Sequence, residues 1–114
     1  MNLLDTDAVI EQLKDTQYEP GYITVVTLIE VLRGIEEQKR NVIKKLLEES
    51  YNLLTLDNKV ITTYCTLYQT LREKGETLPD VDLLIAASAI SNKLNLKTRD
   101  NHFNKLKPFG LQTT

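Results

Sequence analysis

The chain is poor in the residues on which disulfides, zinc sites and histidine catalysis depend. Its 114 residues include one cysteine and one histidine. With Cys65 alone, an internal disulfide and a cysteine-based metal cage are excluded, and we predict that this thiol is a small core residue rather than a nucleophile. With His102 alone, catalysis by a pair of histidines is excluded, and we expect this side chain in a solvated loop.

Long apolar runs and several common site motifs are also missing. No run approaches the roughly 20 apolar residues that span a bilayer, so no membrane association is expected. Asp5 and Asp7 lie where the basic residues of a signal peptide would be, and no such peptide is expected. The sparse cysteine favours a reducing, cytoplasmic location. The chain has no Walker A loop, GxGxxG turn, serine triad motif or zinc-ligand spacing.

The charge balance leaves a nucleic-acid partner open. Lysine and arginine number 14 and aspartate and glutamate 16, for a net charge of −2, which one bound divalent cation would cancel. One stretch near the C-terminus is basic, with Asp100 as its single acid. Its cations are Lys93, Lys97, Arg99, Lys105 and Lys107. Alone, such a stretch is typical of a solvated face, but beside a metal site it favours contact with phosphate groups.

Four acidic residues stand where an apolar segment would not be expected to carry charge. They are Asp5, Glu30, Asp82 and Asp100, each at the end of or within a run of apolar residues. Burying an unpaired carboxylate costs several kcal/mol. A shared divalent cation would offset that cost, and clustered carboxylate oxygens suit Mg²⁺ or Mn²⁺.

The order of apolar and amphipathic segments predicts one α/β domain over residues 1–114. Strands are expected at residues 2–5, 22–24, 52–56, 94–98 and 110–113. Helices are expected at residues 6–14, 27–38, 39–50, 59–74 and 81–92, with Thr6, Thr27 and Asp57 as N-caps and Gly75 as a stop. The four acids would then lie at the carboxyl edge of a parallel sheet, where residues distant in sequence meet.

Four short motifs, in this order along the chain, carry a resemblance to a known family. They are Leu4-Asp5-Thr6-Asp7, Glu30-Val31-Leu32-Arg33-Gly34, Asp82-Leu83-Leu84-Ile85-Ala86-Ala87 and Thr98-Arg99-Asp100-Asn101-His102-Phe103. With them the chain resembles the PIN-domain nucleases, and within these the VapC-type toxins of prokaryotic toxin–antitoxin pairs, over nearly its whole length. Two positions depart from the family pattern. Asp7 replaces the usual asparagine and is either a fifth negative charge near the metal or a surface charge at a helix start, and we favour the second interpretation. His102 stands where many relatives have another acid.

The resemblance implies a three-layer α/β/α sandwich with a central parallel sheet and the activity of a Mg²⁺- or Mn²⁺-dependent endoribonuclease. Asp5, Glu30, Asp82 and Asp100 would be its catalytic residues. Asp5, Asp82 and Asp100 would bind the metal directly or through water, and Glu30 would bind it or orient the attacking water. The substrate would be a structured RNA, tRNA or ribosomal RNA, and a cognate antitoxin would cover the site.

A homodimer is also implied by the resemblance, through the helices between residues 30 and 50 and part of the helix at 59–74. The apolar side chains offered by the first of these regions include Val42, Ile43, Leu46 and Leu47.

Several neighbours of the acids have two interpretations each. Thr6 and Thr98 either hydrogen-bond the carboxylates or a metal-bound water, or are an N-cap and a strand residue. Arg33, three positions after Glu30, either forms a simple ion pair or orients the site. Lys97 and Arg99 either bind RNA phosphate or are surface charges.

Three other functions compete with a toxin. A PIN nuclease of RNA maturation or decay would lack an antitoxin, and gene neighbourhood separates it from a toxin. An inactive PIN-like binding module is disfavoured because it has no use for four converging carboxylates. A phospho-acceptor receiver domain is disfavoured because Asp57 lies too far beyond the third strand.

Overall fold

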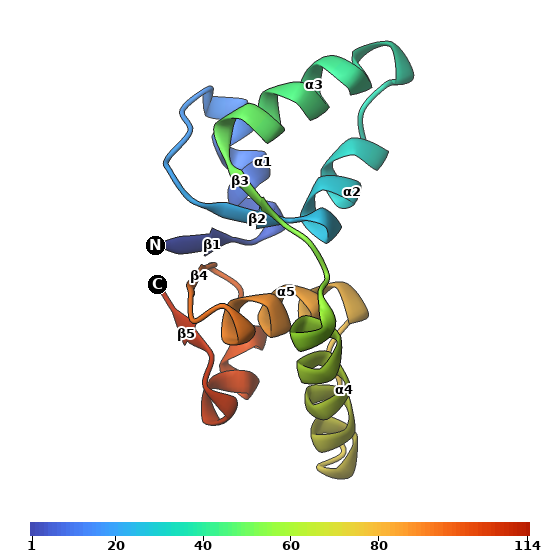
Figure 1. Ribbon diagram of the computed structural model, residues 1–114, viewed down its shortest axis with the longest axis vertical. Helices are drawn as coiled ribbons and strands as arrows, with labels where there is room; N and C mark the ends of the chain where they lie inside the picture. The colour runs from blue at the N-terminus through green and yellow to red at the C-terminus, as the bar shows by residue number, and fades with distance from the viewer.

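A sheet of five short parallel strands forms the centre of the computed structural model, which describes residues 1–114 (Figure 1). The strands are β1 (Asn2–Leu4), β2 (Tyr22–Thr24), β3 (Asn52–Leu54), β4 (Asn95–Lys97) and β5 (Gln112–Thr113). They lie in the order β3-β2-β1-β4-β5, and all neighbours are parallel. The order therefore reverses between β1 and β4, which places a crevice at the carboxyl ends of these two strands.

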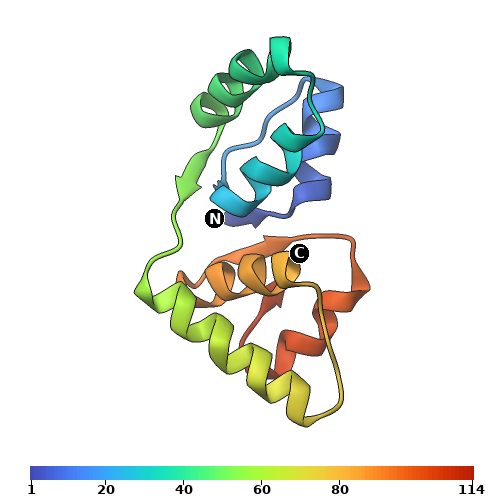
Figure 2. The ribbon, with the colours of Figure 1, turned by 90° about the vertical axis from the view of Figure 1, so that its right-hand side faces the viewer.

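Helices pack on both faces of the sheet, although they do not cover every strand on each face. They are α1 (Thr6–Asp15), α2 (Val25–Arg33), α3 (Glu37–Ser50), α4 (Asn58–Glu73), α5 (Asp80–Ser91) and the 3-10 helix η1 (Asn101–Phe109). Leu3 and Leu4 point to opposite faces, as successive strand residues do. Leu4 packs in a core with residues of α1, α2 and α3, and Leu3 in a core with residues of α4, α5 and η1. Figure 2 shows these two groups on either side of the strands, which confirms the three-layer α/β/α fold.

Two helices are capped by a residue other than the expected one. The side chain of Asp5 accepts a hydrogen bond from the Ala8 N–H at 2.9 Å, so Asp5 rather than Thr6 is the N-cap of α1. Thr24 accepts from the Thr27 N–H at 3.1 Å and caps α2. The prediction that Thr27 is the cap was therefore wrong, because the chain turns into the helix directly at the end of β2.

The expected helix at residues 27–38 also ends early. Helix α2 stops at Arg33, with Gly34 as its C-cap. Glu36 then has an extended backbone, with φ −56° and ψ 141°, before α3 begins at Glu37. Glycine disfavours a continued helix, so the chain breaks here and α3 starts two residues before the predicted position of 39.

Several strands are shorter than predicted, and the structure contains one helix that was not predicted. Asp5 and Thr98 were placed inside strands, but both lie just beyond the carboxyl ends of β1 and β4. No helix was predicted between Asp100 and the last strand, and His102 was expected in a loop. The residues after Asp100 form η1, whose first turn is capped by the Asp100 side chain accepting from the His102 N–H at 2.9 Å. Gly110, with φ +101°, ends this helix.

Cys65 is exposed on the surface of α4, so the prediction that it is a core residue was wrong. Helix α4 buries the face that carries Val60, Leu67 and Leu71. Cys65 is two residues before Leu67, which on a helix of 3.6 residues per turn directs it away from that face. The expected exposure of His102 is confirmed, although it lies in η1 rather than in a loop.

Helix α5 is apolar on most sides because it packs against both α4 and β4. Its buried residues include Leu83, Ile85, Ala86 and Ala89. This packing fixes its first turn, which carries Asp82, at the carboxyl edge of the sheet. No helix of the chain combines the length and apolar content that crossing a membrane requires.

Replacing Gly21 by alanine should destabilise the fold by about 1–3 kcal/mol, the usual range for overpacking. A Cβ there would lie 2.8 Å from Leu4 Cδ1 and 2.9 Å from the backbone oxygen of Asn2, and the backbone atom cannot yield easily. Gly34→Ala is the control, because its Cβ would meet nothing nearer than 3.7 Å. Urea unfolding should rank the two in this order; equal midpoints would contradict the packing described for β1 and β2.

Candidate active site

The four acids singled out in the sequence line one pocket at the carboxyl edge of the sheet. Asp5 follows β1, Glu30 lies on α2, Asp82 is in the first turn of α5, and Asp100 caps η1. The pocket has a volume of about 200 Å³, and Thr6, Asp7, Ile85 and Phe103 complete its lining. Segments from across the chain thus bring four carboxylates together, as the sequence predicted.

Asp5 is the most buried of the four and is held at both oxygens. Its Oδ1 accepts the Ala8 N–H at 2.9 Å, and its Oδ2 accepts the hydroxyl of Thr98. Burial raises the pKa of Asp5 above its ordinary value; the hydrogen bonds from Thr98 and Ala8 lower it in part, while the charges of Asp7 and Asp100 add to the increase. The fold therefore fixes this carboxylate in an environment that disfavours its charge.

Thr98 links two of the acids. While its hydroxyl donates to Asp5, its Oγ1 accepts the backbone N–H of Asp100 at 3.0 Å. The residue after β4 thus ties the end of β1 to the start of η1 across the point where the strand order reverses. Of the two interpretations of Thr98 in the sequence, the geometry favours the hydrogen bond to a carboxylate.

Glu30 is held by a small cluster of hydroxyls and one cation. The Thr6 hydroxyl donates to Glu30 Oε1 at 2.6 Å, and Arg33 Nη2 lies 3.4 Å from Oε2. The hydroxyls of Thr6 and Thr27 are 3.2 Å apart, and Thr27 is fully buried. Because Thr6 donates its proton to Glu30, the proton between the two threonines comes from Thr27.

Thr27 is a site neighbour that the sequence reasoning assigned only to a cap. The available signal was its position three residues before Glu30, which puts the two on one face of a helix. Arg33 contacts Glu30 but lies outside the pocket lining, with 69% of its side chain exposed. We therefore place it at the rim.

Asp82 and Asp100 complete the pocket. Burial raises the pKa of Asp82, and the charges of Asp100, Glu30 and Asp5 raise it further, against a lowering contribution from His102. No hydrogen bond offsets these effects. Asp100 has His102 Nδ1 2.8 Å from its Oδ1, so the one histidine of the chain stands at the rim beside a site carboxylate.

Asp7 satisfies both interpretations given to it. It is exposed in the first turn of α1, where a negative charge is favoured by the helix dipole. It also lines the acidic pocket, and its charge contributes to the raised pKa of Asp5.

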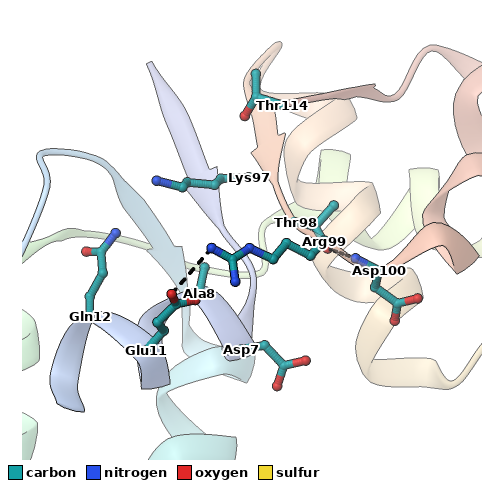
Figure 3. A pocket seen from close by; sticks show the side chains of 9 residues that line it. All are labelled: Asp7, Ala8, Glu11, Gln12, Lys97, Thr98, Arg99, Asp100 and Thr114. Carbon is teal, nitrogen blue, oxygen red and sulfur yellow. Dashed lines mark hydrogen bonds and ion pairs between the residues drawn. The ribbon is translucent and has the colours of Figure 1, made fainter. Parts of the chain in front are cut away.

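The basic stretch divides around the site. Lys97 and Arg99 line a second, larger cleft of about 730 Å³ that adjoins the acidic pocket and shares Asp7 and Asp100 with it (Figure 3). Lys105 points elsewhere, with its Nζ 3.4 Å from the Thr77 carbonyl oxygen. Lys93 and Lys107 line neither hollow. Two of the five cations are therefore beside the acids.

The donor set of the pocket fits a hard divalent cation. It offers carboxylate and hydroxyl oxygens and no sulfur, which suits Mg²⁺ or Mn²⁺. No three acids are close enough as they stand to form a metal centre. Carboxylates without a cation repel one another, and Mg²⁺ commonly keeps several waters between itself and its ligands. Asp5, Asp82 and Asp100 could hold such an ion, with Glu30 beside it.

Comparisons with known proteins agree with this geometry. A family model described as PIN domain matches residues 3–107. Ribonuclease VapC1 of Methanocaldococcus jannaschii is 32% identical, in an alignment that covers 96% of this chain and 84% of the relative. These matches confirm the resemblance found in the sequence.

Two solved structures share the fold. VapBC-1 from nontypeable Haemophilus influenzae superposes with a TM-score of 0.82 at 22% identity, covering 99% of this chain and 96% of that chain. VapBC-5 from Mycobacterium tuberculosis, described as a member of the VapBC family of toxin–antitoxin systems, gives a TM-score of 0.74 at 26% identity, covering 99% and 94%. The three-layer architecture is thus shared over nearly the whole of both chains.

Replacing Asp82 by asparagine should raise the melting temperature of the metal-free protein at neutral pH. Because the folded-state pKa of Asp82 is raised, the parent loses stability as the pH rises from the ordinary value of 3.8 through the folded value. The variant lacks this loss, so its advantage should vanish well below pH 3.8. Thermal unfolding in EDTA across pH measures it.

The control for this experiment is Asp15→Asn, at the exposed end of α1, which should shift the melting temperature less. A lower melting temperature for Asp82→Asn at neutral pH would show that the carboxylate is a structural support.

Proposed function

Because this chain belongs to the PIN domain family, we propose that it is a divalent-metal-dependent endoribonuclease of the VapC type. The observation that carries the proposal is the pocket that Asp5, Glu30, Asp82 and Asp100 line together. Asp5 and Asp100 also cap α1 and η1, but capping does not require four partly desolvated carboxylates to share one pocket. The name of the relative, Ribonuclease VapC1, supports RNA as the substrate.

In this proposal Asp5, Asp82 and Asp100 hold Mg²⁺ or Mn²⁺. The ion, when bound, would lower the pKa of a water and neutralise charge on the phosphate that is attacked. Glu30 is placed to orient that water, because Thr6 and Arg33 restrain its two oxygens. Thr98 keeps Asp5 and Asp100 in fixed relation. These contacts hold the carboxylates in place before RNA binds, so that the site needs little rearrangement during the reaction.

The proposed substrate is a structured RNA, tRNA or ribosomal RNA, cut in a single-stranded loop. A loop backbone can reach a shallow pocket that a duplex cannot enter. Lys97 and Arg99, in the adjoining cleft, are the cations proposed to attract RNA phosphate. The cytoplasm, where RNA is abundant and an exposed Cys65 stays reduced, is the proposed location.

The proposed protein partner is a cognate antitoxin. The solved relatives named VapBC are toxin–antitoxin complexes, including one from Salmonella typhimurium described as DNA bound. An antitoxin that covers the acidic pocket would inhibit the nuclease. Its basic side chains or hydrogen-bond donors would contact the carboxylates of the pocket.

Cleavage of RNA should require metal and the acid quartet. Asp5→Asn and Asp82→Asn should each lower the cleavage rate on the order of 100-fold or more, and EDTA should abolish cleavage by the parent. Asp15→Asn, outside the pocket, should cleave normally. The assay follows a labelled loop-containing RNA with added Mg²⁺ or Mn²⁺. Full activity of the parent after removal of metal would contradict the proposed mechanism.

A homodimer is proposed through α2, α3 and part of α4. Large apolar side chains are exposed on each of these helices, among them Ile29, Val42 and Ile61. Of the apolar set expected for this contact, Leu47 is fully buried in the chain's own core and Ile43 packs against it. Val42, 69% exposed, is therefore the stronger anchor.

Light scattering at micromolar concentration should give the mass of two chains, and Val42→Glu should shift it toward one by placing a charge in an apolar contact. Lys14→Glu, in the last turn of α1, is the charge-changing control and should remain a dimer. A parent that scatters as a monomer would contradict the proposal.

A further inference from the structure

The cleft beside the acidic pocket has features that the four carboxylates do not explain. Its volume of about 730 Å³ is lined by polar and charged side chains, with Ala8 as the one apolar residue. It meets the acidic pocket at Asp7 and Asp100, which line both hollows. A chain-like ligand whose reacting group lies among the acids would therefore continue into this cleft.

The cleft exists because one half of a sheet face has no helix over it. The core of α1, α2 and α3 contains Leu4 and Ile23, from β1 and β2. In register with Leu4 on the next strand is Lys97. On the same face lie Asn95 of β4 and the exposed Gln112 of β5, which are in register with each other. These side chains of β4 and β5 have no apolar group to bury, so this half-face stays open and polar.

Each of the two cations in the cleft already has a carboxylate partner. Lys97 Nζ lies 2.8 Å from Glu19 Oε1, and Arg99 Nη2 lies 3.4 Å from Glu11 Oε1. The two pairs differ in strength. Glu19 Oε1 is buried and has no other polar contact, so losing Lys97 would leave it unpaired at a high cost. Lys97 is therefore committed to Glu19.

Arg99 is the cation that can change partners. Its side chain is 88% exposed and that of Glu11 is 51% exposed, so water and salt screen the pair and it contributes little. Figure 3 shows Arg99 reaching from the end of β4 across the cleft toward Glu11 on α1, with Asp7 and Asp100 on one side of the pair and Lys97 and Thr114 on the other. A ligand running along the cleft must pass this pair.

We infer that the cleft is a phosphate subsite for the part of the RNA strand next to the cut. In this subsite a backbone phosphate replaces Glu11 as the ion-pair partner of Arg99. The inference rests on the proposed function. A guanidinium binds phosphate through two parallel hydrogen bonds, whereas its contact with Glu11 is a single one at 3.4 Å. Glu11 thus acts as a counter-charge that weakens the binding of anions. Lys97 keeps its pair with Glu19 and attracts the strand only through its charge.

The composition of the cleft favours a nucleic-acid backbone over other anions. None of its lining residues is aromatic, so it offers no platform on which bases stack. It holds instead the cations Lys97 and Arg99, and the hydroxyl of Thr114 and the amide of Gln12 beside them suit phosphate and ribose oxygens. The acids Asp7, Glu11 and Asp100 of the same lining oppose a free anion, so the strand is held only where a cation is released to it. Its continuity with the acidic pocket matches a strand that carries a phosphate on either side of the cut.

The test measures RNA affinity without cleavage. A short fluorescein-labelled single-stranded RNA of mixed sequence is titrated with protein that carries Asp82→Asn, and anisotropy is followed at several KCl concentrations. Glu11→Gln in this background should bind about two- to fivefold more tightly, the range that an exposed ion pair can contribute. Glu73→Gln, which removes the same charge at the far end of α4, should change nothing.

A double-mutant cycle separates exchange at Arg99 from simple removal of a negative charge. In the Arg99→Gln background the gain from Glu11→Gln should shrink, because no guanidinium remains to be released. The salt slope should also flatten by about 0.7 when Arg99 is replaced, as for one lost contact to a single strand.

An equal gain in both backgrounds, no gain over Glu73→Gln, or no RNA binding by any variant would overturn the inference. Its failure is distinguishable from failure of the proposed function. RNA cleavage by protein with Asp82 intact, together with no effect of Glu11→Gln, would contradict the phosphate subsite alone. Absence of cleavage would contradict the nuclease itself.

Discussion

The arrangement at the carboxyl edge of the sheet depends on holding negative charges together against their mutual repulsion. Asp5 and Asp82 have raised pKa values chiefly because they are desolvated, and the neighbouring acids add to the effect. The fold opposes this repulsion with rigid supports. Asp5 is fixed by the Ala8 N–H and the Thr98 hydroxyl, and Thr98 in turn is fixed by Asp100. A bound cation would relieve the repulsion between the carboxylates and offset the cost of burying them.

The position of the site follows from the same constraint. The reversal of strand order between β1 and β4 brings residues about 90 positions apart into hydrogen-bond contact, as the Asp5–Thr98 pair shows. One side of this point is closed by helices and holds the acids. The other side is left open over β4 and β5, and it holds Arg99 and Lys97. The first hollow is thus acidic, whereas the second carries both signs, with Glu11 opposite the two cations and Asp7 and Asp100 at the boundary between the hollows.

The sequence predicted that the four acids would come together because two of them had no local explanation and all four lay in one set of ordered motifs. A carboxylate at the end of an apolar run, such as Asp5, or within one, such as Glu30, needs a reason that burial and periodicity do not supply. Asp82 and Asp100, taken alone, could have been a helix cap and a turn residue. Features that depend on tertiary contacts could not be predicted from the sequence. The buried hydroxyl of Thr27 looked like a cap, Cys65 looked apolar until the packed face of α4 was known, and η1 was hidden in a polar segment interrupted by Pro108. The pairing of Arg99 with Glu11 joins residues with no relation along the chain.

The central claim is that the four carboxylates form a cation site, and a Mg²⁺ titration of the melting temperature tests it most directly. A cation that binds the folded chain and not the unfolded one stabilises it by about 2.7 kcal/mol at a concentration 100 times its Kd. The melting temperature of the parent should therefore rise steadily with Mg²⁺, and that of Asp5→Asn should rise much less. A parent melting temperature that stays constant across the titration would contradict the account.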